Sequence, residues 1–255
     1  MRFASHRDIA RTVERALRRA RVPVAYSAGF SPHPKISYPG AAPTGVASEA
    51  EYLEILVTEP YPAESFRQEL DAAMPEGLDV LAVEADPDDG LSDRLEGSAW
   101  QIELPGVSSE SAGRAVAAFL TESAVEVERV TKKGRRRFDT RGAVLALRVC
   151  QHSGPDPEYA TIQLVVRHTT PTVRPDDVVT ALRQVADLAP PAPARVTRLA
   201  QGPLAEVGRL VDGGAVATDA AQAEALASSR PQAPSTPTQP AQAATQSRPT
   251  AERPE

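Results

Sequence analysis

The sequence has 255 residues, a formal net charge of -6, 41% hydrophobic residues and only 4% aromatic residues. These values are typical of a soluble globular protein of one or two domains. The single cysteine, Cys150, excludes an internal disulfide framework and any multi-cysteine metal or iron–sulfur site made by this chain alone, and it favours a cytoplasmic location. Because no apolar run approaches the length needed to cross a bilayer, we expect no contact with membranes.

Residues 1–90 show the order β-α-β-β-α-β. Residues 1–5 are predicted to end a strand, and Ser5 is placed to cap a helix whose apolar stripe contains Ile9, Val13, Leu17 and Ala20. A second amphipathic helix is predicted at 63–74, and strands are predicted at 22–27, 51–59 and 77–85.

The same order returns in residues 98–205. Helices are predicted at 108–123 and 174–189, and strands at 99–104, 124–131, 143–150, 160–168 and 194–200, with an extra strand-like piece at 135–138. The repeated order predicts an α+β protein built from two tandem ferredoxin-like halves, each a split β-α-β unit. Residues 214–255 contain almost nothing to bury, so we expect a disordered C-terminal tail.

The net charge conceals two basic clusters. Residues 1–40 have a balance of +6, whereas residues 41–96 have a balance of -13. The polar side of the first helix and the segment "KKGRRR" are predicted to contact a nucleic-acid backbone through Arg11, Arg15, Arg18, Lys132, Lys133, Arg135, Arg136 and Arg137. For the helix, pairing with the acids of residues 49–96 is an equally good interpretation. For the segment around Lys132, RNA is favoured over a simply solvated turn, although the low aromatic content argues against a platform for stacking bases.

Two stretches give the sequence a family resemblance. "RFASHRDIARTVERALRRARVPVAYSAGFSPHPKISY", followed by "PTGVASEAEYLEI", resembles the N-terminal signature of the radical SAM-linked family, a domain of unknown function. "VTKKGRRRFDTR" and "TTPTVRPDDVVTAL" resemble its later signature, so the resemblance covers about residues 1–205 and implies a fuller first strand before Arg2. It implies an accessory role beside a radical SAM partner. Radical SAM chemistry needs a cluster held by three thiolates, so we expect no cofactor in this chain.

The stretch "AYSAGFSPHPKISYPG" at residues 25–40 is a candidate anion-binding loop. Pro32 and Pro34 hold the chain extended, so His33 and Lys35 project to the same side. Together with Arg2, His6 and Ser31, they are predicted to bind a phosphate or a carboxylate. The alternative interpretation is a proline-stabilised turn with solvated side chains.

Several other polar residues are possible catalytic or metal-binding groups. Ser5, His6 and Asp8 resemble a catalytic set, but helix capping explains Ser5 and Asp8 better, so only His6 and His33 remain candidate catalytic residues. We expect no metal site, because Glu49, Glu51 and Glu54 are better explained as a solvated strand edge. His152 and His168 have no discernible partners, and Cys150 is predicted to be a small buried hydrophobe.

The leading functional hypothesis is a non-catalytic accessory protein of a radical SAM partner that binds RNA or another anionic substrate. Two alternatives stay open. One is an RNA-acting enzyme that uses His33 or His6 in acid–base catalysis, and the other is a purely structural subunit whose charged faces assemble a complex.

Overall fold

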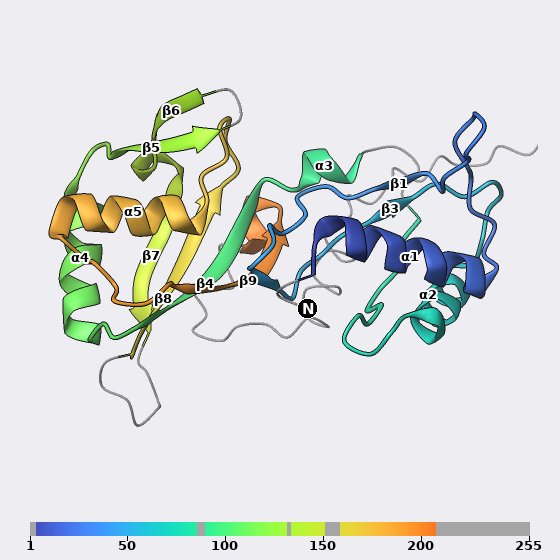
Figure 1. Cartoon of the computed structure of the whole chain (residues 1–255), viewed down its shortest axis with the longest axis horizontal. Helices are drawn as coiled ribbons and strands as arrows, with labels where there is room; N and C mark the ends of the chain where they lie inside the picture. The colour runs from blue at the N-terminus through green and yellow to red at the C-terminus, as the bar shows by residue number, and fades with distance from the viewer. Residues whose placement is uncertain (1–3, 86–89, 132–133, 151–158, 208–255) are drawn as a thin grey trace, which may run out of the picture.

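The computed structural model describes residues 4–85, 90–131, 134–150 and 159–207. These residues form two regions that lie side by side along the long axis of the molecule (Figure 1). The predicted tail at 214–255 and the predicted strand residues 1–3 lie outside the described part of the chain. The architecture is a mixed α+β one, as the sequence pattern predicts.

The second region is built on a five-stranded mixed sheet. Its strands, in spatial order, are β2 (Ala47–Ser48), β9 (Arg195–Gly202), β4 (Gly97–Pro105), β8 (Tyr159–Arg167) and β7 (Val144–Cys150). β2 is parallel to β9, and the other neighbours are antiparallel. Helix α4 (Ser109–Thr121) follows β4, and helix α5 (Pro175–Ala186) joins β8 to β9. The chain order of β4, α4, β7, β8, α5 and β9 is therefore β-α-β-β-α-β.

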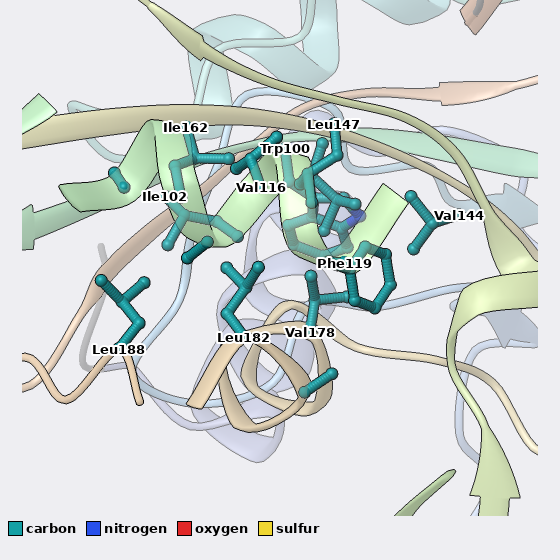
Figure 2. Close-up of a cluster of buried hydrophobic side chains, with 14 of the residues drawn as sticks. Trp100, Ile102, Val116, Phe119, Val144, Leu147, Ile162, Val178, Leu182 and Leu188 are labelled. Carbon is teal, nitrogen blue, oxygen red and sulfur yellow. The ribbon is translucent and has the colours of Figure 1, made fainter. Parts of the chain in front are cut away.

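The main core lies between this sheet and the two helices (Figure 2). It contains two dozen buried residues, among them Ile102 and Ile162 from the sheet, Phe119 from α4 and Leu182 from α5. From Trp100 to Pro105, buried and half-buried side chains alternate along β4, which reflects the period of two of a strand. A much smaller cluster with Ala99, Val165 and Ala200 lies separately from this main core.

A hairpin of β5 (Glu126–Thr131) and β6 (Gly134–Asp139) lies between α4 and β7 in the chain. It accounts for the extra strand-like piece of the sequence pattern. A short 3-10 helix, η1 (Arg141–Ala143), then leads into β7. The Asp139 carboxylate accepts hydrogen bonds from the backbone N–H groups of Val125 at 2.8 Å and Gly142 at 2.9 Å, which fixes the base of the hairpin.

The first region has two helices but little regular sheet. Helix α1 (His6–Ala20) and helix α2 (Ala63–Ala73) pack together, and β1 (Ile36–Ser37) pairs with β3 (Glu54–Ile55). Ser5 caps α1 as predicted, since Asp8 N–H donates to Ser5 Oγ at 3.2 Å and Ser5 N–H donates to the Asp8 carboxylate at 3.3 Å. The core of this region has seven buried residues, centred on Leu17, Phe66 and Leu70.

The prediction of two tandem ferredoxin-like halves is not confirmed. Residues 22–27 make only isolated bridges, and residues 77–85 form no strand among the described residues. Val80 and Val83 pack against the core of the first region, but Val80 N–H donates to the Asp71 carboxylate at 2.8 Å instead of to a strand. The first region instead adds β2 to the sheet of the second region. A short helix, α3 (Leu91–Arg94), connects the two regions.

Candidate functional site

The predicted anion-binding loop is an excursion from a strand. Val24 bridges Val57 and Ile36 pairs with Ile55, both in antiparallel register. Ala25 N–H donates to Leu56 O at 2.7 Å, and Leu56 N–H donates to Lys35 O at 3.1 Å. Because the N–H and C=O groups of one strand residue point to the same edge, residues 22–25 and 35–37 pair with the same edge of one strand. Residues 26–34 form a loop that leaves this strand and returns to it.

Backbone contacts close this loop at its base. Tyr26 bridges Pro34, Ser27 N–H donates to His33 O at 2.8 Å, and His33 N–H donates to Ser27 Oγ at 3.0 Å. Gly29 has a φ of 122°, a conformation that a side chain disfavours. The prolines therefore hold a defined turn, and Pro34 is buried at its base.

The structure does not gather the predicted anion-binding residues into one group. Ser31, His33 and Lys35 are exposed on or beside the loop. His6 is the first residue of α1, whereas the loop follows the last turn of this helix. A helix of 15 residues is about 22 Å long, so its two ends are well separated. The His6 ring lies 5.1 Å from the Tyr38 ring. Arg2 lies outside the described residues.

Tyr38 is the unusual group beside His6. Its hydroxyl is buried and has no hydrogen-bond partner among the described residues. Burial, with a smaller effect from the nearby Glu14 carboxylate, raises the pKa of Tyr38 to about 12. The hydroxyl therefore stays protonated at neutral pH, and it is unsuited to act as a base beside His6.

Helix α1 presents an exposed basic stripe, defined as Arg7, Arg11, Arg15 and Arg18. Spacings of three and four residues place these side chains on one face. In the described part of the chain their polar contacts stay within α1: Arg15 donates to Thr12 Oγ1 at 3.3 Å, and Arg18 lies 3.8 Å from Glu14. Among the described residues, no ion pair joins the stripe to the acids of residues 49–96, so the alternative interpretation of the stripe has no support there.

The sequence that follows Glu14 is free of carboxylates as far as residue 48. No Asp or Glu occurs between residues 15 and 48, and the stretch begins with Arg15 and Arg18 of the stripe. Arg19 in this stretch donates to the Ala73 carbonyl of α2, so it holds the two helices together. The C-terminal half of the stripe and the loop thus share one continuous cationic segment of the chain.

The arginines of the β5–β6 hairpin are differently placed. Arg135 and Arg137 lie 3.1 Å and 3.4 Å from the Glu128 carboxylate across the hairpin. Arg129 lies 2.9 Å from the buried Asp177 of α5, and its guanidinium lies 4.8 Å from the centre of the Phe138 ring. Within the described part of the hairpin, Arg136 is the arginine that has no carboxylate partner, and Lys132 and Lys133 lie outside it. The hairpin therefore offers less unpaired charge than its sequence suggests.

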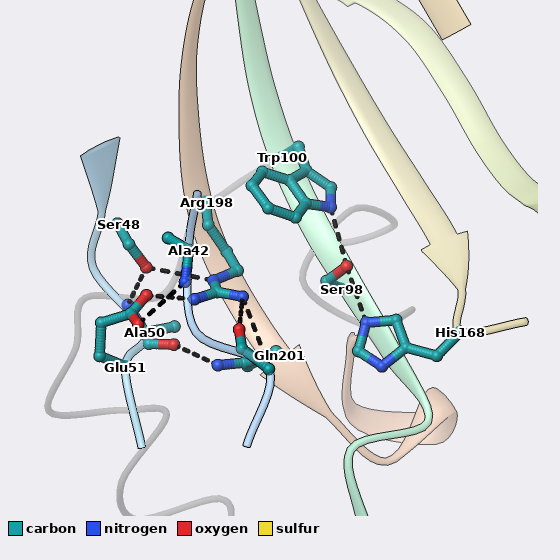
Figure 3. A network of polar contacts seen from close by, with 10 residues as sticks. Ala42, Ser48, Ala50, Glu51, Ser98, Trp100, His168, Arg198 and Gln201 are labelled. Atoms are coloured by element: carbon teal, nitrogen blue, oxygen red, sulfur yellow. Dashed lines mark hydrogen bonds and ion pairs between the residues drawn. The ribbon is translucent and has the colours of Figure 1, made fainter. Parts of the chain in front are cut away.

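A buried polar network that sequence reasoning missed joins the two regions (Figure 3). Arg198 of β9 is 3% exposed and forms an ion pair with Glu51. Its guanidinium also donates to the Gly40 carbonyl, to Ser48 Oγ at 3.1 Å and to Gln201 Oε1 at 3.2 Å. Glu51, whose own side chain is 39% exposed, is thus the partner of a buried arginine, a role that the prediction of a solvated strand edge missed. β9 contains both Arg195 and Arg198, so its sequence does not show which arginine is buried and paired.

A second part of the network contains His168, which has partners that the sequence did not reveal. His168 Nδ1 donates to the Leu95 carbonyl at 2.6 Å, so Nε2 accepts from Ser98 Oγ at 3.1 Å. Ser98 Oγ in turn accepts from Trp100 Nε1 at 2.8 Å. Burial lowers the pKa of His168, the Arg198 charge lowers it further, and the Leu95 bond opposes both.

The pair of Ser98 and His168 has the donor order of a nucleophile and its base, but its location argues for a structural role. Ser98 is only 1% exposed, so a substrate has no access to its hydroxyl in this conformation.

Cys150, predicted to be a buried hydrophobe, is half-buried on β7, and burial raises the pKa of its thiol. The described residues contain no group of His, Cys, Asp and Glu able to hold a metal ion, and none of their helices is long and apolar enough to cross a membrane.

A comparison with known protein families gives a match over most of the chain. A family model described as "Uncharacterized protein conserved in bacteria (DUF2344)" matches residues 1–175, which include the stripe, the loop and the hairpin. The match ends before β9, so Arg198 lies beyond it. No curated protein matches the chain. Because the match spans more than half of the sequence, the chain belongs to the DUF2344 family.

Proposed function

We propose that this protein is a cytoplasmic, non-catalytic accessory protein that binds RNA through the basic stripe of α1. The observation that carries the proposal is the exposure of Arg7, Arg11, Arg15 and Arg18 on one helix face, with few partners in the described chain. A row of exposed guanidinium groups attracts phosphates and releases counterions when it binds them. The acidic surplus of the chain lies in residues 41–96, which have a balance of -13, so electrostatic attraction directs a polyanion to the arginine face of α1 and away from these acids.

The radical SAM partner is the second part of the proposal. It is supported by the resemblance of residues 2–38 and 43–55 to the radical SAM-linked signature. This chain has one cysteine, so the partner has to supply the cluster. The RNA bound on α1 is then the substrate that the accessory protein presents to the partner.

The stripe is favoured over the β5–β6 hairpin as the main contact. Glu128 and Asp177 already form ion pairs with three of the hairpin arginines, and a paired arginine gains less from a phosphate. We propose Arg136, with Lys132 and Lys133, as a secondary contact. The two surfaces belong to different regions of the molecule (Figure 1), so they are separable by mutation.

The test measures how RNA affinity depends on salt. The stripe variant replaces its four arginines by Gln, and a matched control variant removes the same charge from exposed positions of the second region, at Arg114, Arg167, Arg183 and Arg195. For the parent protein, the logarithm of the affinity for a structured RNA should fall linearly with the logarithm of the salt concentration. The stripe variant should lower that slope by up to about three units, because its four guanidinium groups would no longer neutralise phosphates. The control variant should retain most of the parental slope.

Three outcomes would contradict the proposal. A parent protein that binds RNA no better than a neutral protein at low salt would favour the purely structural subunit. Equal slopes for the stripe and control variants would show that binding depends on net charge alone. RNA turnover by the isolated chain that His33→Ala or His6→Ala abolishes would instead identify the acid–base enzyme.

A further inference from the structure

We infer that the loop at residues 26–34 is a stacking platform for unpaired bases, so that the RNA bound by α1 is single-stranded where it passes this loop. The inference rests on the proposed function and names its substrate class. Four observations support it: the exposure of Phe30, the location of the exposed aromatic residues, the charge of the surrounding segment and the stiffness of the loop.

Phe30 is fully exposed, with a relative exposed area of 109%. It stands in the loop between Gly29 and Ser31, and Figure 1 shows this stretch projecting from the first region beyond the C-terminal end of α1. A phenyl ring held in water contributes no burial energy to the fold. A ring in this position is therefore available to a ligand.

Among the described residues, the exposed aromatic side chains lie in this loop. Tyr26, at 46% exposure, and Phe30 are the two exposed aromatic residues in the described parts of the chain. The low aromatic content of the sequence argues against a stacking platform, but the aromatic residues that reach the surface lie in the same short loop. Aromatic faces stack on any base, and this contact contributes to single-strand binding without sequence preference.

The charge around the loop favours a nucleic acid over an apolar pocket of a protein. The loop lies within the carboxylate-free segment from residue 15 to residue 48 and is followed by the exposed Lys35. Arg18 of the stripe and Arg21, which caps α1, lie just before the strand that leads into the loop. A row of cations that leads to exposed rings matches a chain in which phosphates alternate with bases.

The loop is also preorganised. Its two ends are held by the Tyr26–Pro34 bridge and by Lys35 N–H, which donates to Ala25 O at 2.8 Å. Pro32 and Pro34 restrict the chain between these contacts and the tip. Little conformational entropy is then lost when a base stacks on the ring. Duplex RNA keeps its bases paired and presents its backbone, so it should use the stripe alone.

The test compares Phe30→Ala and Phe30→Trp with the parent protein. The probes are an oligoadenylate single strand and an RNA duplex with the same number of phosphates, and Leu120→Ala, at another exposed apolar residue, is the matched control. Phe30→Ala should bind the single strand about tenfold more weakly and should bind the duplex as the parent does. Phe30→Trp should retain the affinity, and its indole fluorescence should be quenched by the single strand but not by the duplex. Because Phe30 is exposed, all variants should keep the parental unfolding midpoint.

The outcomes separate this inference from the proposed function. If the stripe variant loses its salt slope while Phe30→Ala binds both probes as the parent does, the stacking platform is refuted and the RNA-binding proposal stands. If neither probe binds the parent protein, both the stacking platform and the proposed RNA-binding function are refuted. If Phe30→Ala instead changes the sedimentation coefficient of the protein at constant RNA affinity, the loop is a contact between copies of this chain and the inference is wrong.

Discussion

The two regions have the same order of helices and strands in the sequence pattern, but only the second builds a continuous sheet from its own strands. β4 and β8 pair over nine residues without interruption. In the first region the corresponding segments contain Pro23, Pro32, Pro34 and Pro39, each of which removes a backbone donor. Among its described residues, the two-residue strands β1 and β3 pair with each other, and β2 pairs with β9 of the second region.

The two regions therefore have different structural roles. The second is a scaffold, and the first carries loops on its surface. The second region places two dozen residues in one core, whereas the first places seven and uses its chain for the loop at 26–34 and for the segment around Glu51 that pairs with Arg198. Binding residues are concentrated on loops that a rigid framework positions. The comparison therefore points to the first region as the binding part and to the second as its support.

The largest expected effect is the loss of stability when the main core of the second region loses a side chain. Phe119→Ala removes a ring with 0% exposure from the main core and should lower the free energy of unfolding by about 3 to 5 kcal/mol. Phe66→Ala, in the core of the first region, should cost less, because most of its apolar neighbours are only partly buried and water can fill the gap. Urea denaturation measures both. Equal losses of unfolding free energy would mean that the two cores stabilise the protein equally, which would contradict the proposed difference between the regions.

The next effect concerns the junction between the regions. Arg198→Met removes the guanidinium that pairs with Glu51 and donates to the Gly40 carbonyl, and should cost about 3 kcal/mol, because it leaves these groups without their partner. Arg195→Met, at an exposed position of the same strand, is the control and should cost little. A double-mutant cycle with Glu51→Gln should return a favourable coupling energy. Additive losses would show that the pair does not hold the regions together.

The sequence predicts the second region better than it predicts the first. β4, α4, β8 and α5 appear where periodicity places them, because their apolar residues repeat along uninterrupted segments. The capping box at Ser5 and Asp8 is local, so four residues contain all of its information. The strand predicted at 77–85 rests on apolar alternation alone. Val80 and Val83 do pack inward, but packing against a core does not require a strand partner.

The candidate site was predictable only in its local parts. The stripe follows from helical spacing, and the stiffness of the loop follows from its prolines. The sequence does not reveal that Glu128 neutralises Arg135 and Arg137, because this pairing depends on the register of the hairpin. The pair of Glu51 and Arg198 joins two distant parts of the chain, and no local pattern encodes such a contact. Prediction failed where partners come from distant segments.

A smaller effect compares the two serine caps. Ser5 caps α1 and Ser108 caps α4, and each accepts a backbone hydrogen bond at 3.2 Å. Ser5→Ala and Ser108→Ala should each cost about 1 kcal/mol. Hydrogen exchange should distinguish them, because Ser5→Ala should speed exchange mainly in α1, while Ser108→Ala should speed it throughout the larger core. Uniform faster exchange in both variants would mean that the two regions unfold as one unit.

The smallest expected effect is the pH dependence that His168 gives to the junction. Burial and the Arg198 charge hold the pKa of His168 below its ordinary value of 6.5, so the folded protein binds fewer protons at this site than the unfolded chain. The stability that depends on the neutral ring is therefore complete above about pH 6.5 and is lost as the pH falls toward the lowered pKa. Protonation would also turn Nε2 into a donor facing Ser98 Oγ, which then has to release the Trp100 bond or reorient its own proton. His168→Gln should flatten the change in unfolding free energy between about pH 7 and about pH 5, whereas His33→Gln, in the exposed loop, should keep the parental slope. If His168→Gln keeps the parental slope as well, the protein owes its pH dependence to other groups and the ring is simply packed beside Leu95 and Ser98.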